Sequence, residues 1–395
     1  MPFHGLHGTE IATFDLNAKT LRCGRFLLYV VCVPKPHQQK TPAIVAGLLE
    51  WYSKNARDLP WRRTRDPYAV WVSEIMLQQT QVKTVIPYWE RWMHSLPDVR
   101  SLAAADLELL HKLWEGLGYY TRVRNMQRAA LEIVQNHGGV FPRDFEQILA
   151  LPGIGPYTAG AIGSIAFNQP RPILDGNVAR VIARVFAMPG DPRMKPHREK
   201  FWRIAGDLVQ CAEQYATASH PAACSALNQA LMELGALVCS PRNPACTVCP
   251  LLRQCQALQT GLVESLPTLM KRPKATPRWF HAFIVRRGGK FLVRQRPAET
   301  VNALLWEFPN IETTTADADP AEQTAILLGY PALVEFKTSF THSITRYKIQ
   351  VCVYTATAPK GEVEGCQWVS RSRLSELPFS SAHRRIADLA QTLKP

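Results

Sequence analysis

The sequence has no apolar run long enough to span a membrane as a helix. The longest apolar run among the 395 residues, Phe26–Val33, falls far short of the roughly 20 residues that a bilayer requires. Prolines follow this run instead of a small-residue cleavage site. We expect no membrane span, and we read residues 1–40 as an extension holding a strand or an irregular segment. Internal repeats and low-complexity tracts are also missing.

Acidic residues are few compared with basic ones. The sequence has 32 Asp and Glu against 46 Lys and Arg, a net charge of +14. Such an excess favours a polyanionic partner. Charge alone fits nucleic acid, an anionic membrane surface or simple solubility.

A disulfide framework is also missing. Four of the ten cysteines crowd into one short segment, and the others are scattered, which indicates a reducing compartment and a metal site. Four thiolates at these spacings can hold either a tetrahedral zinc ion or one [4Fe-4S] cluster, and the spacing does not choose between them. The four are Cys239, Cys246, Cys249 and Cys255.

Strand signals are almost absent between residues 41 and 263. Helical periodicity recurs there, for example over Leu102–Trp114, and predicts one all-helical domain or two helical lobes. A linker rich in proline and lysine follows at 264–277. Beyond it the apolar period changes to two, and Gly288-Gly289 marks a hairpin, so 278–395 is predicted to be a separate α+β domain.

The chemistry is predicted to lie on a helix that begins at Pro67. Asp66 can cap this helix, and Glu74 interrupts its apolar side. A carboxyl group among apolar neighbours has a raised pKa, which suits a general acid. Gln78 lies one turn further, where its amide can share a surface with Glu74 and read a base edge. The alternative is a structural Glu that reaches solvent or an arginine.

A turn between two predicted helices carries Gly153 and Gly155. Such glycines let the backbone approach a ligand, and the second helix can bind a phosphate through its first N–H groups. A simple helix connector has the same pattern.

A second carboxyl group, Asp175, ends an apolar run just before another helix. Its ordinary role there is a helix cap. Paired with Glu74, it can instead stabilise a developing sugar cation while the other acid protonates a leaving group. Asn177 is placed to hold either carboxyl by a hydrogen bond.

Aromatic and basic residues alternate with glycines over residues 114–124. Such a segment can wedge into a duplex while its cations hold phosphates. The alternative is a packed tyrosine pair, and we expect one of Tyr119 and Tyr120 to serve that way.

Taken in order, these motifs closely resemble those of the adenine DNA glycosylases of the MutY type, in the helix-hairpin-helix superfamily of base-excision enzymes. The resemblance runs from about Pro42 to the C-terminus. It is carried by Leu59-Pro60-Trp61-Arg62, residues 73–82, 116–120, 151–155 and 174–178, and the four-cysteine segment.

The resemblance implies that adenine mispaired with 8-oxoguanine or G is flipped out of duplex DNA and its N-glycosidic bond is hydrolysed. It implies that Glu74 protonates the base and handles the water, while Asp175 stabilises an oxocarbenium-like sugar. The remaining implied roles are the adenine pocket for Arg62 and Leu77, adenine reading for Glu233, the 8-oxoguanine for Gln79 and Thr80, the wedge for Tyr120, and [4Fe-4S] ligation for Cys239, Cys246, Cys249 and Cys255.

One position separates the sister families. Lyase members, similar to endonuclease III, carry a lysine just after the hairpin, because a Schiff base with the abasic sugar needs an amine. This sequence has Tyr157 there, whose hydroxyl can at most assist beside Asp175. We therefore predict a monofunctional glycosylase that leaves an intact abasic site.

The C-terminal domain resembles a Nudix fold through residues 294–297 and 304–309. The glutamate-rich helix that binds Mg²⁺ in the hydrolases does not follow, so we predict recognition without hydrolysis. Phe340, Thr341 and His342 match the loop by which the glycosylase family checks for 8-oxoguanine, with Thr in place of Ser. The hydroxyl is kept, and the extra methyl group can shift the fit.

Other functions stay open at this point. A related glycosylase for oxidised pyrimidines or G·T mismatches is the nearest alternative, and a DNA-binding redox sensor without catalysis is another; the two carboxyl groups argue against the sensor. We expect a monomer that binds duplex DNA containing A·8-oxoguanine or A·G, associates with no membrane, and passes the abasic site to downstream repair enzymes. If the protein is bacterial, we expect it in the cytoplasm with the nucleoid.

Overall fold

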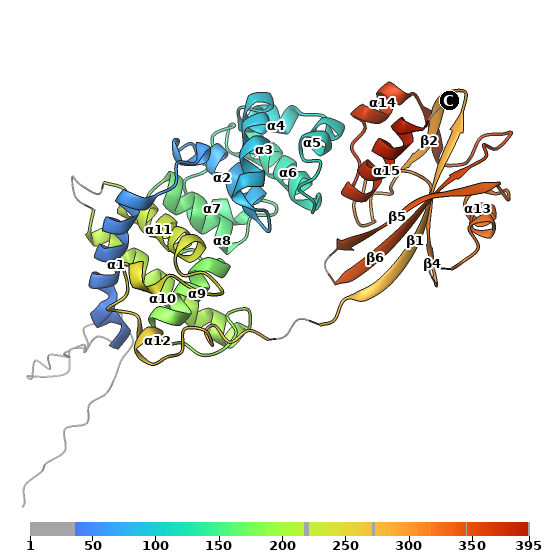
Figure 1. The fold of residues 1–395 in the computed structure, drawn as a ribbon. Helices are drawn as coiled ribbons and strands as arrows, with labels where there is room; N and C mark the ends of the chain where they lie inside the picture. Colours follow the sequence, from blue (N-terminus) through green and yellow to red (C-terminus); the bar gives the residue numbers. More distant parts are fainter. Residues whose placement is uncertain (1–35, 217–220, 271–272, 316, 345, 394–395) are drawn as a thin grey trace, which may run out of the picture.

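The computed structural model describes residues 36–216, 221–270, 273–315, 317–344 and 346–393. A helical domain is followed by a domain built on a sheet (Figure 1). Helix α1 (Pro36–Asn55) begins ahead of the expected boundary at residue 41. The strand or irregular segment predicted before it lies outside the described residues. Among the described helices, none is long and apolar enough to cross a membrane.

The helical domain contains no strand in the residues that the structure describes, as predicted. Its elements after α1 are η1 (Pro60–Arg62), α2 (Pro67–Leu77), α3 (Val82–Ser95), α4 (Val99–Ala104), α5 (Leu107–Leu113), α6 (Thr121–Asn136), α7 (Phe145–Ala150), α8 (Pro156–Ala161), the π-helix η2 (Ile162–Ala166), α9 (Gly176–Val185), α10 (Lys195–Gln214), α11 (Ala223–Leu237), η3 (Cys246–Val248) and α12 (Gln256–Gln259).

The single helix predicted over Leu102–Trp114 is wrong. The chain forms α4 and α5 instead, and Asp106 caps α5 by accepting a hydrogen bond from the Glu108 N–H. An Asp side chain that bonds to the backbone two residues ahead favours a cap over a helix interior, and this local preference prevails here.

Two hydrophobic cores divide the helical domain into two lobes. One core joins α1 with α9, α10 and α11, and the other joins α2, α3, α5 and α6 around Trp71, Trp92 and Trp114. Every residue of α2 from Tyr68 to Met76 is buried. Because α2 is buried all round, a charged side chain on it has to lie inside the protein or line a cavity.

The C-terminal domain is a seven-stranded mixed sheet with the strand path β3-β2-β1-β6-β5, and with β4 and β7 pairing with β1 and β2. Helix α15 packs in the core on one face and α13 in the core on the other (Figure 1). The elements are β1 (Thr276–Arg287), β2 (Lys290–Gln295), β3 (Trp306–Glu307), β4 (Asn310–Thr313), α13 (Pro320–Leu328), β5 (Val334–Ile344), β6 (Tyr347–Ala356), β7 (Cys366–Val369), α14 (Arg371–Glu376) and α15 (Ser381–Thr392).

The predicted hairpin between β1 and β2 is confirmed. Gly288 and Gly289 have φ of 54° and 77°, the left-handed conformation that a two-residue hairpin turn needs and that glycine adopts at little cost. The predicted α+β class of this domain is therefore correct.

The linker is shorter than the predicted 264–277. Leu266 is buried in the core of the α1 lobe, and the Met270 N–H donates to Asp191 of the helical domain. Strand β1 already begins at Thr276. Both ends of the predicted linker thus belong to folded domains.

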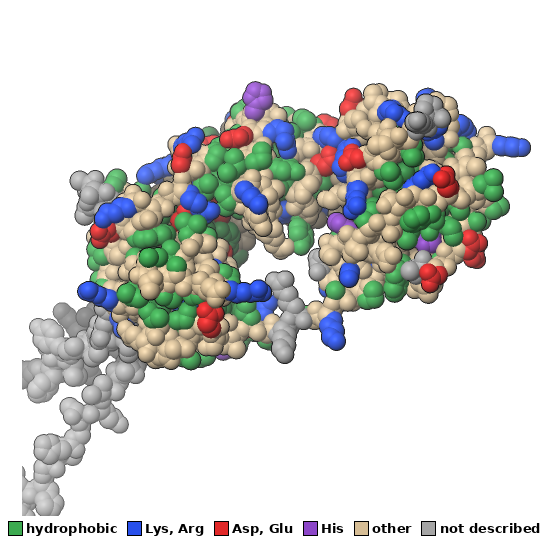
Figure 2. All heavy atoms as spheres, viewed as in Figure 1, with side chains coloured by type: hydrophobic (Ala, Val, Ile, Leu, Met, Phe, Trp, Pro, Cys, Tyr) green, Lys and Arg blue, Asp and Glu red, His purple; other side chains and the backbone are tan. Residues whose placement is uncertain are grey.

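The two domains contact each other through residues on and after α5. The Glu115 carboxylate accepts hydrogen bonds from Arg384 and from the Phe379 N–H, and the Tyr120 hydroxyl donates to the Phe379 carbonyl at 3.1 Å. Leu305 packs in the core of the α2 lobe. In Figure 2 the two domains touch in the upper part of the view, and an open hollow separates them below. Lys and Arg side chains are spread over both domains.

Candidate active site

The beginning of α2 is built as predicted. Asp66 accepts hydrogen bonds from the N–H groups of Tyr68 and Ala69, and Pro67 occupies the first helical position, where its missing N–H is no loss. The helix ends at Leu77, with Gln78 as its C-cap. This short, buried helix fixes the depth of Glu74.

A cavity of about 560 Å³ opens between the two lobes, within the size range of small-molecule sites. Elements η1, α2, α8, α9 and α11 all contribute to its wall. It brings together most of the residues predicted for the site: Arg62, Glu74, Leu77, Gln78, Gln79, Thr80, Tyr157, Asp175, Asn177 and Glu233. The prediction that Glu74 and Asp175 meet around one site is therefore confirmed.

Glu74 has the electrostatics of a general acid. Its side chain is 5% exposed, and burial raises its pKa to about 7, with a further upward contribution from the Asp175 charge. The Tyr157 hydroxyl donates to Glu74 Oε2 at 2.7 Å and limits the rise. A pKa near neutrality keeps a proton available for transfer at physiological pH.

Asp175 is both a helix cap and a cavity residue, so its capping role does not exclude the second role predicted for it. One carboxylate oxygen accepts from the Val178 N–H at 2.7 Å and thereby caps α9, and the other accepts from Asn177 Nδ2 at 2.8 Å. Burial raises the pKa of Asp175, and these two donors oppose the rise. Hydrogen bonds of this kind stabilise the ionised form of a carboxyl group.

Glu233 lies in the same cavity with the opposite electrostatics. Its carboxylate accepts from the Arg57 backbone, Arg57 Nε and Nη2, and from both terminal nitrogens of Arg62, at 2.7 to 3.1 Å. Burial alone would raise the pKa of Glu233, but the two guanidinium groups outweigh it and lower the pKa to about 2. Glu233 is thus a buried anion clamped between two cations.

Arg57 and Met232 are site residues that the sequence did not single out. Arg57 reaches Glu233 across 176 positions of the chain, and Met232 Sδ accepts a hydrogen bond from the Tyr157 hydroxyl. The only sequence signal was the nearness of Arg57 to the Leu59–Arg62 motif. The pairing of Arg57 with Glu233 depends on how α1 and α11 pack against each other, which the sequence does not show.

The prediction that Tyr120 is the wedge is wrong for this structure. Tyr120 is 3% exposed and bonded to the C-terminal domain, whereas Tyr119 is 46% exposed with a φ of 50°. One tyrosine of the pair is packed, as expected, and it is Tyr120. The side chain available for insertion into a duplex is Tyr119.

The hairpin turn lies outside the cavity. Helices α7 and α8 flank it, and Gly153 has a φ of 76° with room for no side chain, since a Cβ there would lie 2.6 Å from Asn125 Cβ. Gly155 is the N-cap of α8, where a Cβ would meet nothing within 4 Å. The turn sets the direction of α8, which carries Tyr157 to Glu74, and its predicted phosphate contact stays a prediction.

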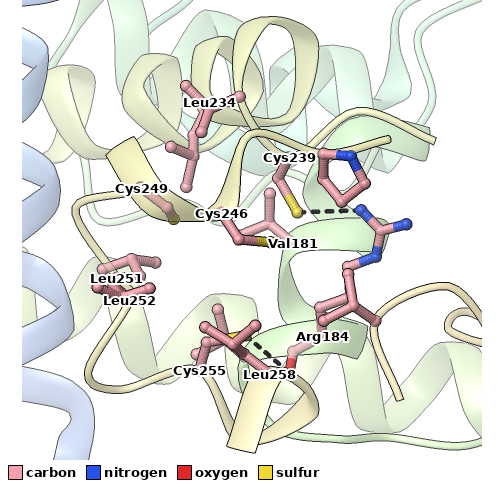
Figure 3. A pocket seen from close by; sticks show the side chains of 14 residues that line it. Val181, Arg184, Leu234, Cys239, Cys246, Cys249, Leu251, Leu252, Cys255 and Leu258 are labelled. Carbon is pink, nitrogen blue, oxygen red and sulfur yellow. Dashed lines mark hydrogen bonds between the residues drawn. The ribbon is translucent and has the colours of Figure 1, made fainter. Parts of the chain in front are cut away.

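The four clustered cysteines line a second cavity (Figure 3). Among the described residues, no three His, Cys, Asp or Glu side chains are grouped tightly enough to qualify as a site for a metal ion. The buried guanidinium of Arg184 donates to Cys239 Sγ at 3.4 Å, and Cys255 Sγ donates to the Arg184 carbonyl at 3.5 Å. Burial raises the pKa of Cys249 to about 11, so a cationic centre is needed to make it a thiolate.

The predicted lesion-reading loop of the C-terminal domain is a strand. Phe340, Thr341 and His342 all lie on β5, where pairing with Val351, Gln350 and Ile349 of β6 holds them in a regular strand. Phe340 is buried under the Arg385 guanidinium, Thr341 is exposed, and His342 lines a separate cavity of about 260 Å³. Since side chains alternate along a strand, Thr341 faces away from that cavity.

Comparisons with known proteins agree with this architecture. Residues 72–206 match the model of the HhH-GPD superfamily of base excision DNA repair proteins, and residues 281–389 match the NUDIX domain. A thermostable thymine-DNA glycosylase has a similar fold, with a TM-score of 0.50 and 26% identity over 57% of this chain and all of that one. Fold and site together define a base-excision repair protein with an appended Nudix domain.

Two relatives are more specific. The chain is 34% identical to the adenine DNA glycosylase of Homo sapiens, over 89% of this chain and 75% of that protein. It is equally identical to the adenine DNA glycosylase of Arabidopsis thaliana, of which it spans 64%, a little under two thirds. The protein belongs to the adenine DNA glycosylase family.

Proposed function

We propose that this protein is a monofunctional DNA glycosylase that removes adenine from duplex DNA where it is mispaired with 8-oxoguanine or G. The observation that carries the proposal is the pair of carboxyl groups, the buried Glu74 and the half-buried Asp175, in one cavity of suitable size. The choice of adenine as the base rests on the relatives, which are adenine DNA glycosylases. An enzyme that acts on a base in a duplex has to flip the nucleotide into such a cavity.

Glu74 provides the proton. In the neutral form it transfers a proton to a ring nitrogen of the flipped adenine, so that the bond from the sugar C1′ to the base breaks with its electron pair going to the base. The resulting carboxylate then takes a proton from the water that adds to C1′, which leaves free adenine and an abasic sugar. A pKa of about 7 suits both halves of this cycle.

Asp175 stabilises the sugar while the bond is broken. Its two hydrogen-bond donors, the Val178 N–H and the Asn177 amide, favour the anion that an oxocarbenium-like sugar requires. Tyr157 holds Glu74 in place, and it has no amine with which to form a Schiff base. This arrangement supports hydrolysis without strand cleavage.

Recognition of the base and its partner falls to the remaining cavity residues. We assign contact with adenine to Arg62, Leu77 and Glu233, which line the cavity, and contact with the opposite base to Gln78, Gln79 and Thr80 at the end of α2. The Nudix domain adds a second check of the 8-oxoguanine, and we assign this contact to His342, which lines the cavity of that domain.

A [4Fe-4S] cluster fits the four-cysteine cavity. All four donors are cysteines, whose thiolates are the ligands that iron–sulfur clusters use, and the buried Arg184 offers a hydrogen bond and a positive charge to such a thiolate at Cys239. When bound, the cluster would tie the segment from Cys239 to Cys255 together. We assign it a structural role in holding α11 and the chain that follows.

The test is adenine release from defined duplexes. The purified protein should release free adenine, measured by chromatography, from A opposite 8-oxoguanine, and should nick the strand only after alkali. The Glu74→Gln variant should bind the same duplex without releasing adenine. Release of no adenine by the unmutated protein, or turnover by the variant, would disprove the proposal.

Two related substrates test the alternative glycosylase function in the same assay. Because the fold matches a thymine-DNA glycosylase, thymine opposite G and an oxidised pyrimidine should be offered in parallel. Release of thymine in preference to adenine would favour the alternative glycosylase. We further propose a monomer whose abasic product passes to downstream repair enzymes and which, if the protein is bacterial, acts in the cytoplasm with the nucleoid.

A further inference from the structure

One side chain joins the two turns to which we have assigned contact with DNA. From α6, Arg122 Nη1 donates to the carbonyls of Ile75 and Gln78 at 2.7 and 2.8 Å. Its Nη2 donates to the carbonyls of Leu117 and Gly118 at 3.0 and 3.1 Å. The first pair belongs to the end of α2 at the cavity, and the second pair to the turn that presents Tyr119.

Each of these turns contains a residue in a costly backbone conformation. Gln79 has a φ of 61° and Tyr119 a φ of 50°, the left-handed region that non-glycine residues rarely adopt. Such residues are strained and persist only where their surroundings hold them. The four carbonyls bonded by Arg122 lie in the residues that lead into these two positions.

The guanidinium group suits this task better than any other side chain. It lies 5.3 Å from the Trp114 ring centroid and 5.6 Å from that of Tyr119, within cation–π range of both. Two of its carbonyl partners are at the C-terminus of α2, where a positive charge is favourable. A lysine has the charge but lacks the planar fork, so it cannot bond all four carbonyls at once.

We propose that Arg122 is a positioning residue for base extrusion. It fixes the turn that carries Tyr119 relative to the turn at the mouth of the active-site cavity, so that the wedge enters the duplex where the flipped nucleotide leaves it. Arg122 does not line the cavity, and it acts through Tyr119 and Gln79. The inference rests on the proposed glycosylase function.

The experiment compares Arg122→Lys with a matched control, Arg128→Lys, on the exposed side of the same helix. Single-turnover adenine release is measured on two duplexes, one with adenine opposite 8-oxoguanine and one with adenine opposite a stable abasic-site analogue. Extrusion costs least for a base without a partner. Rates are divided by the active fraction of each preparation, so that partial misfolding of a variant does not lower its measured rate.

Arg122→Lys should slow release from the paired adenine by about tenfold or more, the effect of losing roughly one charge-assisted hydrogen bond. On the unpaired adenine it should slow release less than about threefold, and the pH profile set by Glu74 should not move. The control should match the unmutated protein on both duplexes. Equal losses on the two duplexes, or no loss on the paired one, would overturn the proposal.

A second measurement separates this inference from the proposed function. With 2-aminopurine in place of adenine, extrusion raises fluorescence without any bond cleavage. If the unmutated protein extrudes the base but releases none, the proposed function fails while Arg122 can still be judged by its effect on the fluorescence. Unchanged extrusion in Arg122→Lys would overturn the positioning role by itself.

Discussion

Replacing Glu74 by Gln should abolish adenine release and at the same time stabilise the protein above neutral pH. Burial raises the pKa of Glu74 from 4.5 to about 7. A carboxyl group whose pKa is raised by folding binds its proton more tightly when folded, so it costs no stability below pH 4.5. The cost grows as pH rises from 4.5 to 7 and is constant above that.

The size of the effect follows from the same shift. At about 1.4 kcal/mol per pH unit, the ionised Glu74 costs the folded state about 3 kcal/mol. Gln keeps the shape and can still accept the Tyr157 hydrogen bond, but it has no charge to bury. The melting temperature of Glu74→Gln should therefore exceed that of the unmutated protein by about 5–10 °C at pH 8 and match it at pH 4.5.

The assay pairs thermal melting with a pH profile of single-turnover adenine release. Release by the unmutated protein should fall about tenfold per unit above pH 7, since only the protonated acid reacts. Glu90→Gln, an exposed carboxyl on α3, is the control and should change neither curve. The reasoning is refuted if Glu74→Gln melts lower at pH 8, or if release by the unmutated protein persists unchanged to pH 9.

Three further predictions follow from the contacts. Asp175→Asn should lower adenine release by about 10²-fold or more at a cost of only about 1–3 kcal/mol in stability, because Asn still caps α9 although its amide nitrogen cannot accept from Asn177; melting and single-turnover rates decide it. Glu115→Gln should remove the ion pair with the partly buried Arg384 at a cost of about 1–3 kcal/mol, seen as faster hydrogen exchange over residues 116–120. Cys249→Ala should lower both the iron content and the visible absorbance of the purified protein, and a variant that retains its iron would contradict the assigned ligand.

The sequence was most informative where a local pattern dictates a local structure. The capped start of α2, the glycine hairpin and the change of period after the linker depend only on neighbouring residues, and all three are confirmed. Glu74 was singled out for the same reason, since a carboxyl group within an apolar run has to be buried or to line a cavity.

What the sequence left undecided depends on packing between distant segments. Tyr119 and Tyr120 are adjacent and chemically identical, so only the docking of Phe379 onto one of them shows which is free. The Arg57 ion pair with Glu233 requires α1 and α11 to be neighbours. The extent of β5 likewise depends on its pairing with β6 rather than on its own alternation.

The same cavity holds two buried glutamates with opposite pKa shifts, and their difference explains how the site can keep an acid protonated. Arg62 lines the cavity and lowers the pKa of Glu74 only slightly, less than burial raises it, while both of its terminal nitrogens are bonded to Glu233. Glu233 therefore offsets the positive charge of Arg62 and, as an anion with a pKa of about 2, does so at every physiological pH. The ion pair of Glu233 with Arg57 and Arg62 is thus part of what leaves Glu74 free to carry a proton near neutrality.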